Sequence, residues 1–195
     1  MNPVIPTIIA VFETRGTEAY GSEAVNQLEH ALQCASMAVE SEPLQCASMA
    51  VESGAAPGLV AAALLHDIGH ILGEEQLPAD DHADLDDRHE ARAHSWLLQH
   101  FGPAVADPVR LHVAAKRYLC TVDPDYVSAL SPTSLKSYHD QGGNMSDAER
   151  AAFEAEPHFR DAVTLRRWDD LGKTPGLETP GVTFFVPYLE KSLRP

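Results

Sequence analysis

Apolar residues recur along most of the chain at the three- and four-residue spacing of an α-helix, and no clear strand alternation competes with it. Ser22 can cap a helix that runs through Leu28 and Leu32. Pro57 suits the first turn of a second helix, which closes near Gly73. The pattern therefore predicts an all-α fold, with further helices at about Arg88 to Phe101, Pro103 to Leu119, Ser146 to Glu154 and Pro157 to Leu171.

Three segments are expected to be non-helical or irregular. The acidic stretch from Pro78 to Asp87 is typical of a solvated loop, and Leu130 to Asn144 is predicted to be a long loop. From Thr174 onward, the proline and glycine content predicts an irregular tail with one short element. A chain of 195 residues suits one domain with a real core.

An internal repeat interrupts this pattern. The sequence LQCASMAVES occurs at Leu32–Ser41 and again at Leu44–Ser53. Two copies do not make a solenoid, and Pro43 between them would kink or break a helix. The sequence leaves open whether the second copy is looped out, continues the helix after a break, or arose by a recent duplication or an artefact.

Charge and composition exclude several classes of protein. The net charge of −15 argues against nucleic acid or an anionic membrane as a partner, so an anionic substrate would need local cations. No apolar run approaches the length of a membrane span, and the first residues lack the pattern of a secretion signal. Three cysteines without a CxxC pair argue against a disulfide scaffold. These features predict a cytoplasmic protein.

The motif HDIGH closes the apolar helix that Pro57 begins. Its residues His66 and His70 are expected one turn apart on one face, with Asp67 about 100° around the helix. A His-Asp dipeptide alone is weak evidence for a metal site. Further upstream, Tyr20, Glu23 and His30 belong to one polar stripe at helical spacing, which must face either water or a polar cavity.

Other histidine and aspartate residues extend this set. His89 opens one later helix, His112 lies inside another, and Asp169 lies in the segment LRRWDDLG. Imidazole and carboxylate groups suit iron, manganese or zinc. Six such ligands exceed what one open catalytic metal needs, so two metals follow, with Asp67 as the natural bridge. The candidate ligands are His30, His66, Asp67, His89, His112 and Asp169.

The H…HD…D pattern of His30, His66–Asp67 and Asp169 resembles the HD-domain superfamily. The additional His89 and His112 resemble its branch of mixed-valent diiron oxygenases. The segments RGTEAYGSEAVNQLEHALQCA, LVAAALLHDIGH, RHEARAHSWL, PVRLHVAAKRYL and AVTLRRWDDLGK are similar to the organophosphonate-cleaving members of that branch. The resemblance extends from about Thr14 to Lys173, and removal of one repeat copy restores the usual spacing of that family.

The resemblance implies a single HD-domain helical bundle over residues 1–195, with a metal core at about 20–172 and an irregular tail at 173–195. It implies an Fe(II)/Fe(III) pair held by the six ligands and O2 as co-substrate. The expected substrate is a small organophosphonate, either 1-hydroxy-2-(trimethylamino)ethylphosphonate or 2-amino-1-hydroxyethylphosphonate. Cleavage of its C–P bond would give phosphate and glycine betaine or glycine. The sequence does not predict the oligomeric state.

Cations on the predicted helices share faces with these ligands. Lys116 follows His112 by one turn, His70 follows His66 by one turn, and Arg166 precedes Asp169 by three residues. Each is therefore a candidate to bind a phosphonate, whereas Arg167 and Asp170 are expected to point outward. The resemblance adds a hydroxyl contact to the phosphonate from Ser134, a metal position that Tyr20 occupies before substrate arrives, and a place for Glu23 near the substrate amine.

Two other functions are compatible with the same core ligands. An HD-type phosphohydrolase or phosphodiesterase would use a metal-activated water to attack a phosphate ester. A metal-binding regulatory module would need neither Lys116 nor Arg166 for activity. His89, His112 and the pair of Tyr20 and Glu23 favour the oxygenase.

Overall fold

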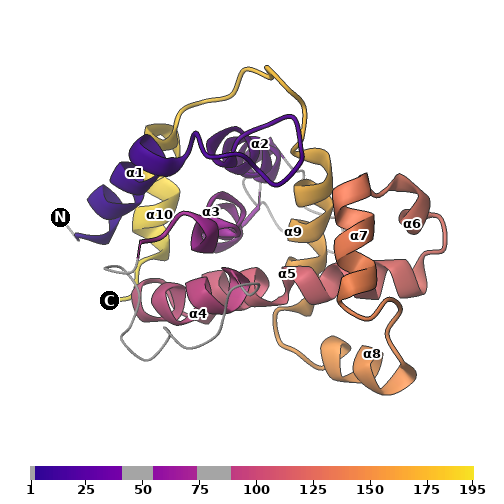
Figure 1. The fold of residues 1–195 in the computed structure, drawn as a ribbon. Helices are drawn as coiled ribbons and strands as arrows, with labels where there is room; N and C mark the ends of the chain where they lie inside the picture. The colour runs from indigo at the N-terminus through magenta and orange to yellow at the C-terminus, as the bar shows by residue number, and fades with distance from the viewer. Residues whose placement is uncertain (1–2, 41–54, 74–88) are drawn as a thin grey trace.

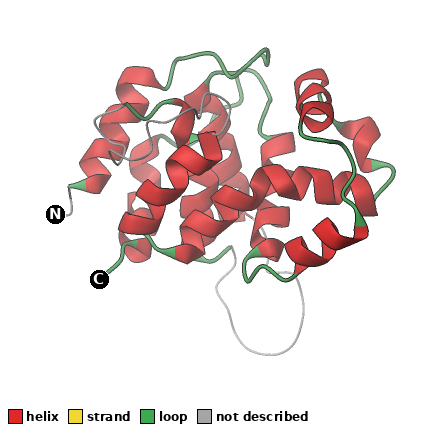
Figure 2. Ribbon diagram, turned by 60° about the horizontal axis from the view of Figure 1, so that its bottom comes forward, coloured by secondary structure: helices red, strands yellow, loops and turns green. Residues whose placement is uncertain are grey.

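The computed structural model describes residues 3–40, 55–73 and 89–195, except for the side chains of residues 89–92, and every regular element in these ranges is helical (Figures 1 and 2). The all-α prediction is therefore confirmed. The α-helices are α1 Val4–Arg15, α2 Gln27–Glu40, α3 Pro57–Leu65, α4 His89–His100, α5 Pro103–Val122, α6 Tyr126–Ala129, α7 Pro132–Asp140, α8 Asp147–Glu154, α9 Phe159–Leu171 and α10 Val186–Ser192, and two 3-10 helices are η1 Ile68–His70 and η4 Val182–Phe185.

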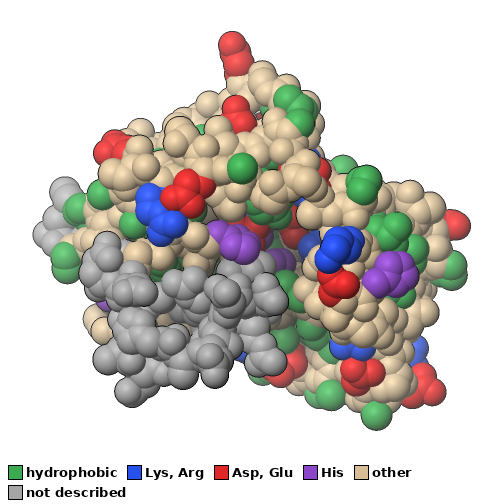
Figure 3. Space-filling view, in the orientation of Figure 1, with side chains coloured by type: hydrophobic (Ala, Val, Ile, Leu, Met, Phe, Trp, Pro, Cys, Tyr) green, Lys and Arg blue, Asp and Glu red, His purple; other side chains and the backbone are tan. Residues whose placement is uncertain are grey.

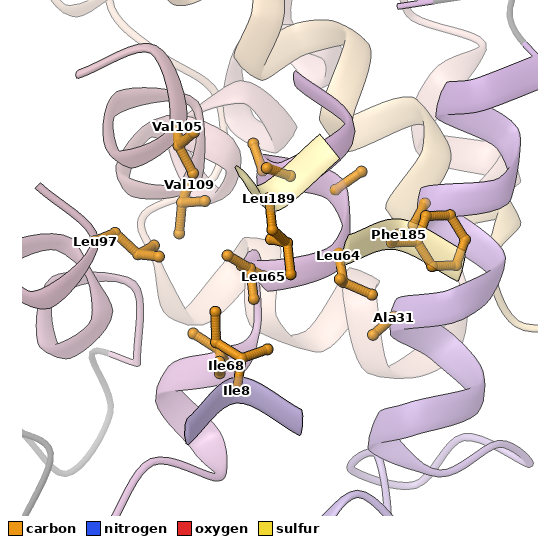
Figure 4. Close-up of a cluster of buried hydrophobic side chains, with 14 of the residues drawn as sticks. Ile8, Ala31, Leu64, Leu65, Ile68, Leu97, Val105, Val109, Phe185 and Leu189 are labelled. Atoms are coloured by element: carbon orange, nitrogen blue, oxygen red, sulfur yellow. The ribbon is translucent and has the colours of Figure 1, made fainter. Parts of the chain in front are cut away.

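The helix α3 lies at the centre of the main core. Its sequence PGLVAAALL is apolar on every side, which is typical of a helix surrounded by other helices. The helices α2, α5, α9 and α10 all pack against it. Figure 4 shows Leu64 and Leu65 of α3 among Ile8 of α1, Leu97 of α4 and Leu189 of α10. None of the helices in the described ranges is long and apolar enough to cross a membrane.

The longest helix, α5, connects this core to the rest of the molecule. It packs against α3, α4 and α9, while α6, α7 and α8 lie near its C-terminal end (Figure 1). The helix α8 begins with a capping box, in which Ser146 and Glu149 exchange hydrogen bonds, and it ends at Glu154 as predicted. The start of α2, the ends of α3 and α9 and the middle of α5 meet where the candidate site lies.

The helix α2 begins later than the sequence pattern predicts. The side chain of Asn26 accepts a hydrogen bond from the backbone N–H of Glu29, and the Glu29 carboxylate accepts one from the N–H of Asn26. This reciprocal capping starts the helix at Gln27. Tyr20 and Glu23 therefore lie on the loop before α2 and not on a helical face with His30, and Ser22 does not cap this helix.

The HDIGH motif is not part of one continuous α-helix. The helix α3 ends at Leu65, and the chain tightens into the 3-10 turn η1, where the N–H of His70 donates to the Asp67 carbonyl at 3.0 Å. The prediction that His66 and His70 share one helix face is therefore wrong. His66 is fully buried, whereas His70 is exposed.

Two further segments are more regular than predicted. The expected loop from Leu130 to Asn144 contains α7, which Ser131 caps by accepting a hydrogen bond from the Ser134 N–H. The expected irregular tail contains η4 and α10, whose Phe185 and Leu189 are fully buried in the main core. The N-terminal helix α1, for which no element was predicted, adds Ile8 to the same core.

The chain returns to α2 after the repeat. The first copy, up to Glu40, forms most of α2, and the N–H of Ala55 donates to the carbonyl of Ala38 at 3.1 Å. The helices that carry His30 and His66 therefore lie side by side. The second repeat copy, Leu44–Ser53, and the predicted acidic loop, Pro78–Asp87, lie outside the described residues.

Candidate functional site

Three imidazoles and two carboxylates converge where α2, α3, α5 and α9 meet. His30 Nε2 lies 3.0 Å from His66 Nε2 and 3.5 Å from Asp169 Oδ1. His66 Nε2 lies 3.2 Å from Asp67 Oδ2, and His112 Nε2 lies 3.7 Å from Asp67 Oδ1. All five residues are buried. The structure thus brings together five of the six residues that the sequence predicted as ligands, which we call the His/Asp cluster.

The sixth candidate, His89, is the first residue of α4, and its side chain lies outside the described part of the molecule. The helix α4 packs against α5 and η1, two elements that border the His/Asp cluster.

Backbone carbonyls orient all three imidazoles of the cluster. Nδ1 of His30 lies 2.8 Å from the Gly172 carbonyl oxygen, Nδ1 of His66 lies 2.9 Å from that of Ala63, and Nδ1 of His112 lies 2.7 Å from that of Val109. Because a carbonyl can only accept, each Nδ1 must donate its hydrogen. Each Nε2 is thereby directed toward the centre of the cluster, which is the usual arrangement of metal-binding histidines.

His30 and His66 have pKa values that are shifted in opposite directions. Burial and the neighbouring His66 lower the pKa of His30 to about 4. Burial also disfavours the charged form of His66, but the carboxylates of Asp67 and Asp169 outweigh it and raise the pKa of His66 to about 9. Protonated His66 Nε2 therefore donates to neutral His30 Nε2. The cluster stabilises a positive charge at this point, and metal binding would release that proton.

The two oxygens of Asp67 face different imidazoles. Oδ2 lies 3.2 Å from His66 Nε2 and 3.7 Å from His30 Nε2, whereas Oδ1 lies 3.7 Å from His112 Nε2. The carboxylate therefore stands between two groups of nitrogen donors. This arrangement fits a carboxylate that bridges two metal ions.

Tyr20 covers one side of the cluster. Its ring stacks on that of His30, with centroids 4.0 Å apart and planes inclined by 17°, and its hydroxyl donates to Asp169 Oδ1 at 3.2 Å. Burial, with Asp169 and Asp67, raises the pKa of Tyr20 well above its usual value. The phenol is therefore neutral and acts as a hydrogen-bond donor to the cluster.

A cavity of about 350 Å³ opens next to the His/Asp cluster. In Figure 3, histidine and acidic surfaces gather around the hollow in the middle of the molecule. Asp67, His112 and Asp169 of the cluster reach its wall. The cavity is also lined by all six residues predicted to contact substrate, namely Tyr20, Glu23, His70, Lys116, Ser134 and Arg166.

Arg166 is held in this wall from two sides. Its guanidinium contacts Asp169 Oδ2 at 2.7 Å, donates to Ser134 Oγ at 3.2 Å and pairs with Asp170 and the Tyr126 hydroxyl. The prediction that Asp170 points outward is therefore wrong, because it pairs with Arg166 one turn away. Although burial opposes it, Arg166 holds the pKa of Asp169 well below its usual value. A fixed fork of N–H donors thus borders the cavity.

Lys116 supplies a second buried cation. It is 3% exposed, and its Nζ donates to Ser137 Oγ at 2.8 Å. Burial, and then repulsion from Arg166, lowers the pKa of Lys116 to about 8. The positive charge on Lys116 is therefore present below about pH 8 and lost above it.

This pKa leads to a pH prediction. If Lys116 binds the substrate anion, the KM for a phosphonate is expected to rise as the pH increases through about 8, because the neutral amine no longer attracts the anion. The Lys116→Arg variant keeps its charge at any such pH, so its KM is expected to stay flat over the same range. Steady-state KM values from pH 6.5 to 9.5 check this, and identical profiles for both proteins would contradict it.

Sequence reasoning missed Lys173, which also lines the cavity. It follows Asp169 by four residues, and its Nζ lies 3.7 Å from Asp169 Oδ1 and donates to Ser134 Oγ at 3.2 Å. The spacing rule that selected Lys116 after His112 would have selected Lys173 as well. Ser137 of α7 and Gln141, which follows this helix, reach the cavity too, but no sequence signal distinguished them within a segment predicted to be a loop.

Gly172 packs so closely against His30 and Cys34 that it leaves no room for a side chain. A β-carbon at this position would lie 2.6 Å from Cys34 Sγ and 3.4 Å from His30 Nδ1. The Gly172 carbonyl orients His30. The Gln33 side chain holds the chain just after Gly172, because its amide donates to the Thr174 carbonyl and accepts from the Thr174 N–H. Any side chain at position 172 must therefore displace the ring or the thiol.

Gly172→Ala is accordingly expected to lower the free energy of unfolding by about 1–3 kcal/mol, the usual cost of overpacking a core. Denaturant unfolding measures this change. Adding Cys34→Ala, which removes the clashing sulfur, is expected to recover much of the loss. Gly181→Ala is the matched control, since a β-carbon there meets nothing within 4 Å. Equal effects at both glycines would refute the steric argument.

The comparisons with known proteins extend this picture. No protein-family model matches the chain. The chain is 41% identical over 190 residues to hydroxymethylphosphonate dioxygenase of Gimesia maris, which covers 97% of this chain and 88% of the relative. It is 36% identical over 189 residues to the glycine-betaine-forming 1-hydroxy-2-(trimethylamino)ethylphosphonate dioxygenase of Leisingera caerulea. This alignment covers 96% of this chain and 89% of the relative. Identity at this level over nearly the whole chain shows that the protein belongs to the family of phosphonate dioxygenases that these two enzymes represent.

Proposed function

We propose that the protein is an O2-dependent dioxygenase that cleaves the C–P bond of a 1-hydroxyphosphonate. One molecule of R–CH(OH)–PO3H2 and one O2 would give R–COOH and H3PO4, which balances without a further reductant. The observation that carries this proposal is the position of Lys116 and Arg166, which open on the same cavity as Asp67, His112 and Asp169 of the His/Asp cluster. Anion binding and metal ligands thus meet in one site.

We propose further that the chain is a single HD domain whose His/Asp cluster holds a mixed-valent Fe(II)/Fe(III) pair. The inward direction of three Nε2 atoms and the two-sided contacts of Asp67 support this assignment. His89 would complete the set as the sixth ligand. When bound, the iron pair supplies the oxidation by O2.

The side chains of the cavity have separate tasks in this proposal. Arg166 and Lys116, with the Ser134 hydroxyl and His70, bind and neutralise the phosphonate. Arg166 also contacts Asp169 at 2.7 Å, so the anion is held beside a proposed ligand. Tyr20 donates a hydrogen bond to Asp169 and shields the cluster from water. Orientation of C1 toward the cluster is therefore set by the phosphonate contacts.

Three candidate substrates can undergo this reaction, and they differ in the substituent R on the carbon that bears the hydroxyl. With R a trimethylammoniomethyl or an aminomethyl group, the products are glycine betaine or glycine, together with phosphate. With R a hydrogen atom, hydroxymethylphosphonate gives formate and phosphate. The two relatives are named for the last and the first of these substrates.

The deciding experiment measures phosphate release from each substrate by the iron-loaded protein, with and without O2. Phosphate release is expected only in air, with about one O2 consumed for each phosphate released, as the balanced reaction requires. The rival function, a phosphohydrolase of the same fold, would act on phosphate esters and would not need O2. Equal phosphate release in an anaerobic chamber would refute the dioxygenase.

A further inference from the structure

Lys173 lies at the end of the cavity where Glu23 is found. It follows α9, and its side chain is only 12% exposed, while that of Glu23 is 15% exposed. The Lys173 ammonium lies 3.7 Å from Glu23 Oε1 and 5.7 Å from the centre of the Tyr20 ring. The same ammonium donates to Ser134 Oγ at 3.2 Å. Lys173 therefore connects the phosphonate-binding side of the cavity with its far end.

The Glu23 carboxylate already has partners within the protein. Its Oε1 accepts a hydrogen bond from Ser131 Oγ at 2.6 Å in addition to the contact with Lys173. The hydroxyl of the neighbouring Ser22 forms a hydrogen bond with the hydroxyl of Thr133 in α7, with the two oxygens 2.6 Å apart. The loop before α2 is thus fastened to the start of α7, and Glu23 is held where its partner is a cation of the chain itself.

Two kinds of group recognise a cationic nitrogen in a protein. A carboxylate attracts it directly, and the face of an aromatic ring attracts it through the ring's electrons. In this cavity the carboxylate is Glu23 and the ring is Tyr20, and the ammonium of Lys173 engages both. A substrate ammonium would have to displace Lys173 and would meet a like charge in a partly dehydrated cavity.

We propose that Lys173 is an internal substitute for a substrate cation, so that the cavity selects 1-hydroxyphosphonates without a positively charged substituent. This inference rests on the proposed function and deepens it, since it selects hydroxymethylphosphonate over the two aminated compounds. Glu23 then serves as the counter-ion of Lys173 and not as the binding group for a substrate amine.

The experiment compares kcat/KM for O2-dependent phosphate release from hydroxymethylphosphonate, the primary amine compound and the trimethylated compound. The natural protein is expected to prefer hydroxymethylphosphonate by at least about tenfold, the effect of one charge-assisted contact. Lys173→Met keeps the apolar stem and removes the charge, and the preference is expected to shrink or invert. Lys173→Arg keeps the charge and is expected to retain the preference.

Lys136→Met is the matched control. Lys136 lies on α7 near the cavity wall, but its side chain is 79% exposed and pairs with Asp140, so its loss is expected to leave all three values unchanged. A merely structural role of Lys173 would lower turnover of the three substrates in parallel and would not alter their ratio. Lys173→Met alone is expected to raise kcat/KM for the aminated compounds relative to hydroxymethylphosphonate. The double variant Lys173→Met with Glu23→Gln is expected to lose this rise, because the carboxylate that would attract the substrate amine is gone.

Failure of this inference is distinguishable from failure of the proposed function. O2-dependent turnover that is fastest with an aminated compound, or an unchanged ratio in Lys173→Met, would overturn the role of Lys173 and leave the dioxygenase intact. Absence of turnover with all three compounds would overturn the function. Calorimetric titration of the three phosphonates under anaerobic conditions ranks their affinities in either case, and tighter binding of an aminated compound would also overturn the inference.

Discussion

His112→Ala is expected to abolish turnover and to lower the iron content of the protein. His112 faces Asp67 Oδ1, whereas His30 and His66 face Oδ2 of the same carboxylate. Its loss would therefore remove one of the two groups of donors between which Asp67 lies. Mutation of a residue that only hydrogen-bonds to a metal ligand commonly costs about 10- to 100-fold in metal affinity or activity. Loss of a ligand itself is therefore expected to cost more. Metal analysis and steady-state kinetics check both effects.

Cys34→Ala is the control for His112→Ala. The donor atoms of His30, Cys34 and His66 all lie within 4.8 Å of one another, so distance alone would admit Cys34 as a ligand. However, burial raises the pKa of the Cys34 thiol well above its usual value, and Sγ donates to the Trp168 carbonyl at 3.5 Å. A neutral thiol is a poor ligand. Full iron occupancy in His112→Ala, or its loss in Cys34→Ala, would contradict the assignment.

Arg166→Met is expected to lower kcat/KM for a phosphonate by about a hundredfold or more. A charge-assisted hydrogen bond contributes about 1.5–3 kcal/mol, and the guanidinium charge also neutralises the phosphonate. The variant would also leave Asp169 without its 2.7 Å partner, so a loss of folding stability is expected as well. Kinetics in saturating O2 and denaturant unfolding measure the two effects separately.

The neighbouring residue provides the matched control for Arg166→Met. Arg167 has the same side chain on the same helix, but it is exposed to solvent. Arg167→Met changes the net charge by the same amount and is expected to leave both kcat/KM and stability nearly unchanged. If the two variants lose activity equally, the effect comes from the overall charge of the protein and not from a phosphonate contact.

The sequence predicted the members of the His/Asp cluster better than their local geometry. Residue type and spacing selected His30, His66, Asp67, His112 and Asp169, and the structure brings these five together. The pattern could not show that α3 ends at Leu65. In the tighter turn that follows, His66 and Asp67 both reach the cluster although they are adjacent, whereas a regular helix would separate them by about 100°.

Short elements and pairings between helices were the main sources of error. The helix α7 has only nine residues, so its apolar periodicity is weak, although Ser131 followed by Pro132 is a recognisable helix start. Asp170 was expected to point outward because only its position relative to Asp169 was considered. It pairs with Arg166 of the same helix, which the four-residue spacing could have predicted, and with Tyr126 of α6, a contact between helices that local spacing does not show.

The hydrogen bond between Ala55 and Ala38 bears on how much the chain length between His30 and His66 can vary. This contact joins the described part of α2 to the residue at which the described chain resumes, so positions 38 and 55 are direct neighbours. In general, the entropy cost of joining two positions by a loop grows slowly with loop length, by about 0.6 kcal/mol for each doubling. A change of chain length between these two positions is therefore expected to cost little stability and to leave the packing of α2 against α3 unchanged. This junction is a point where the chain can gain or lose length while the distance between His30 and His66 stays the same.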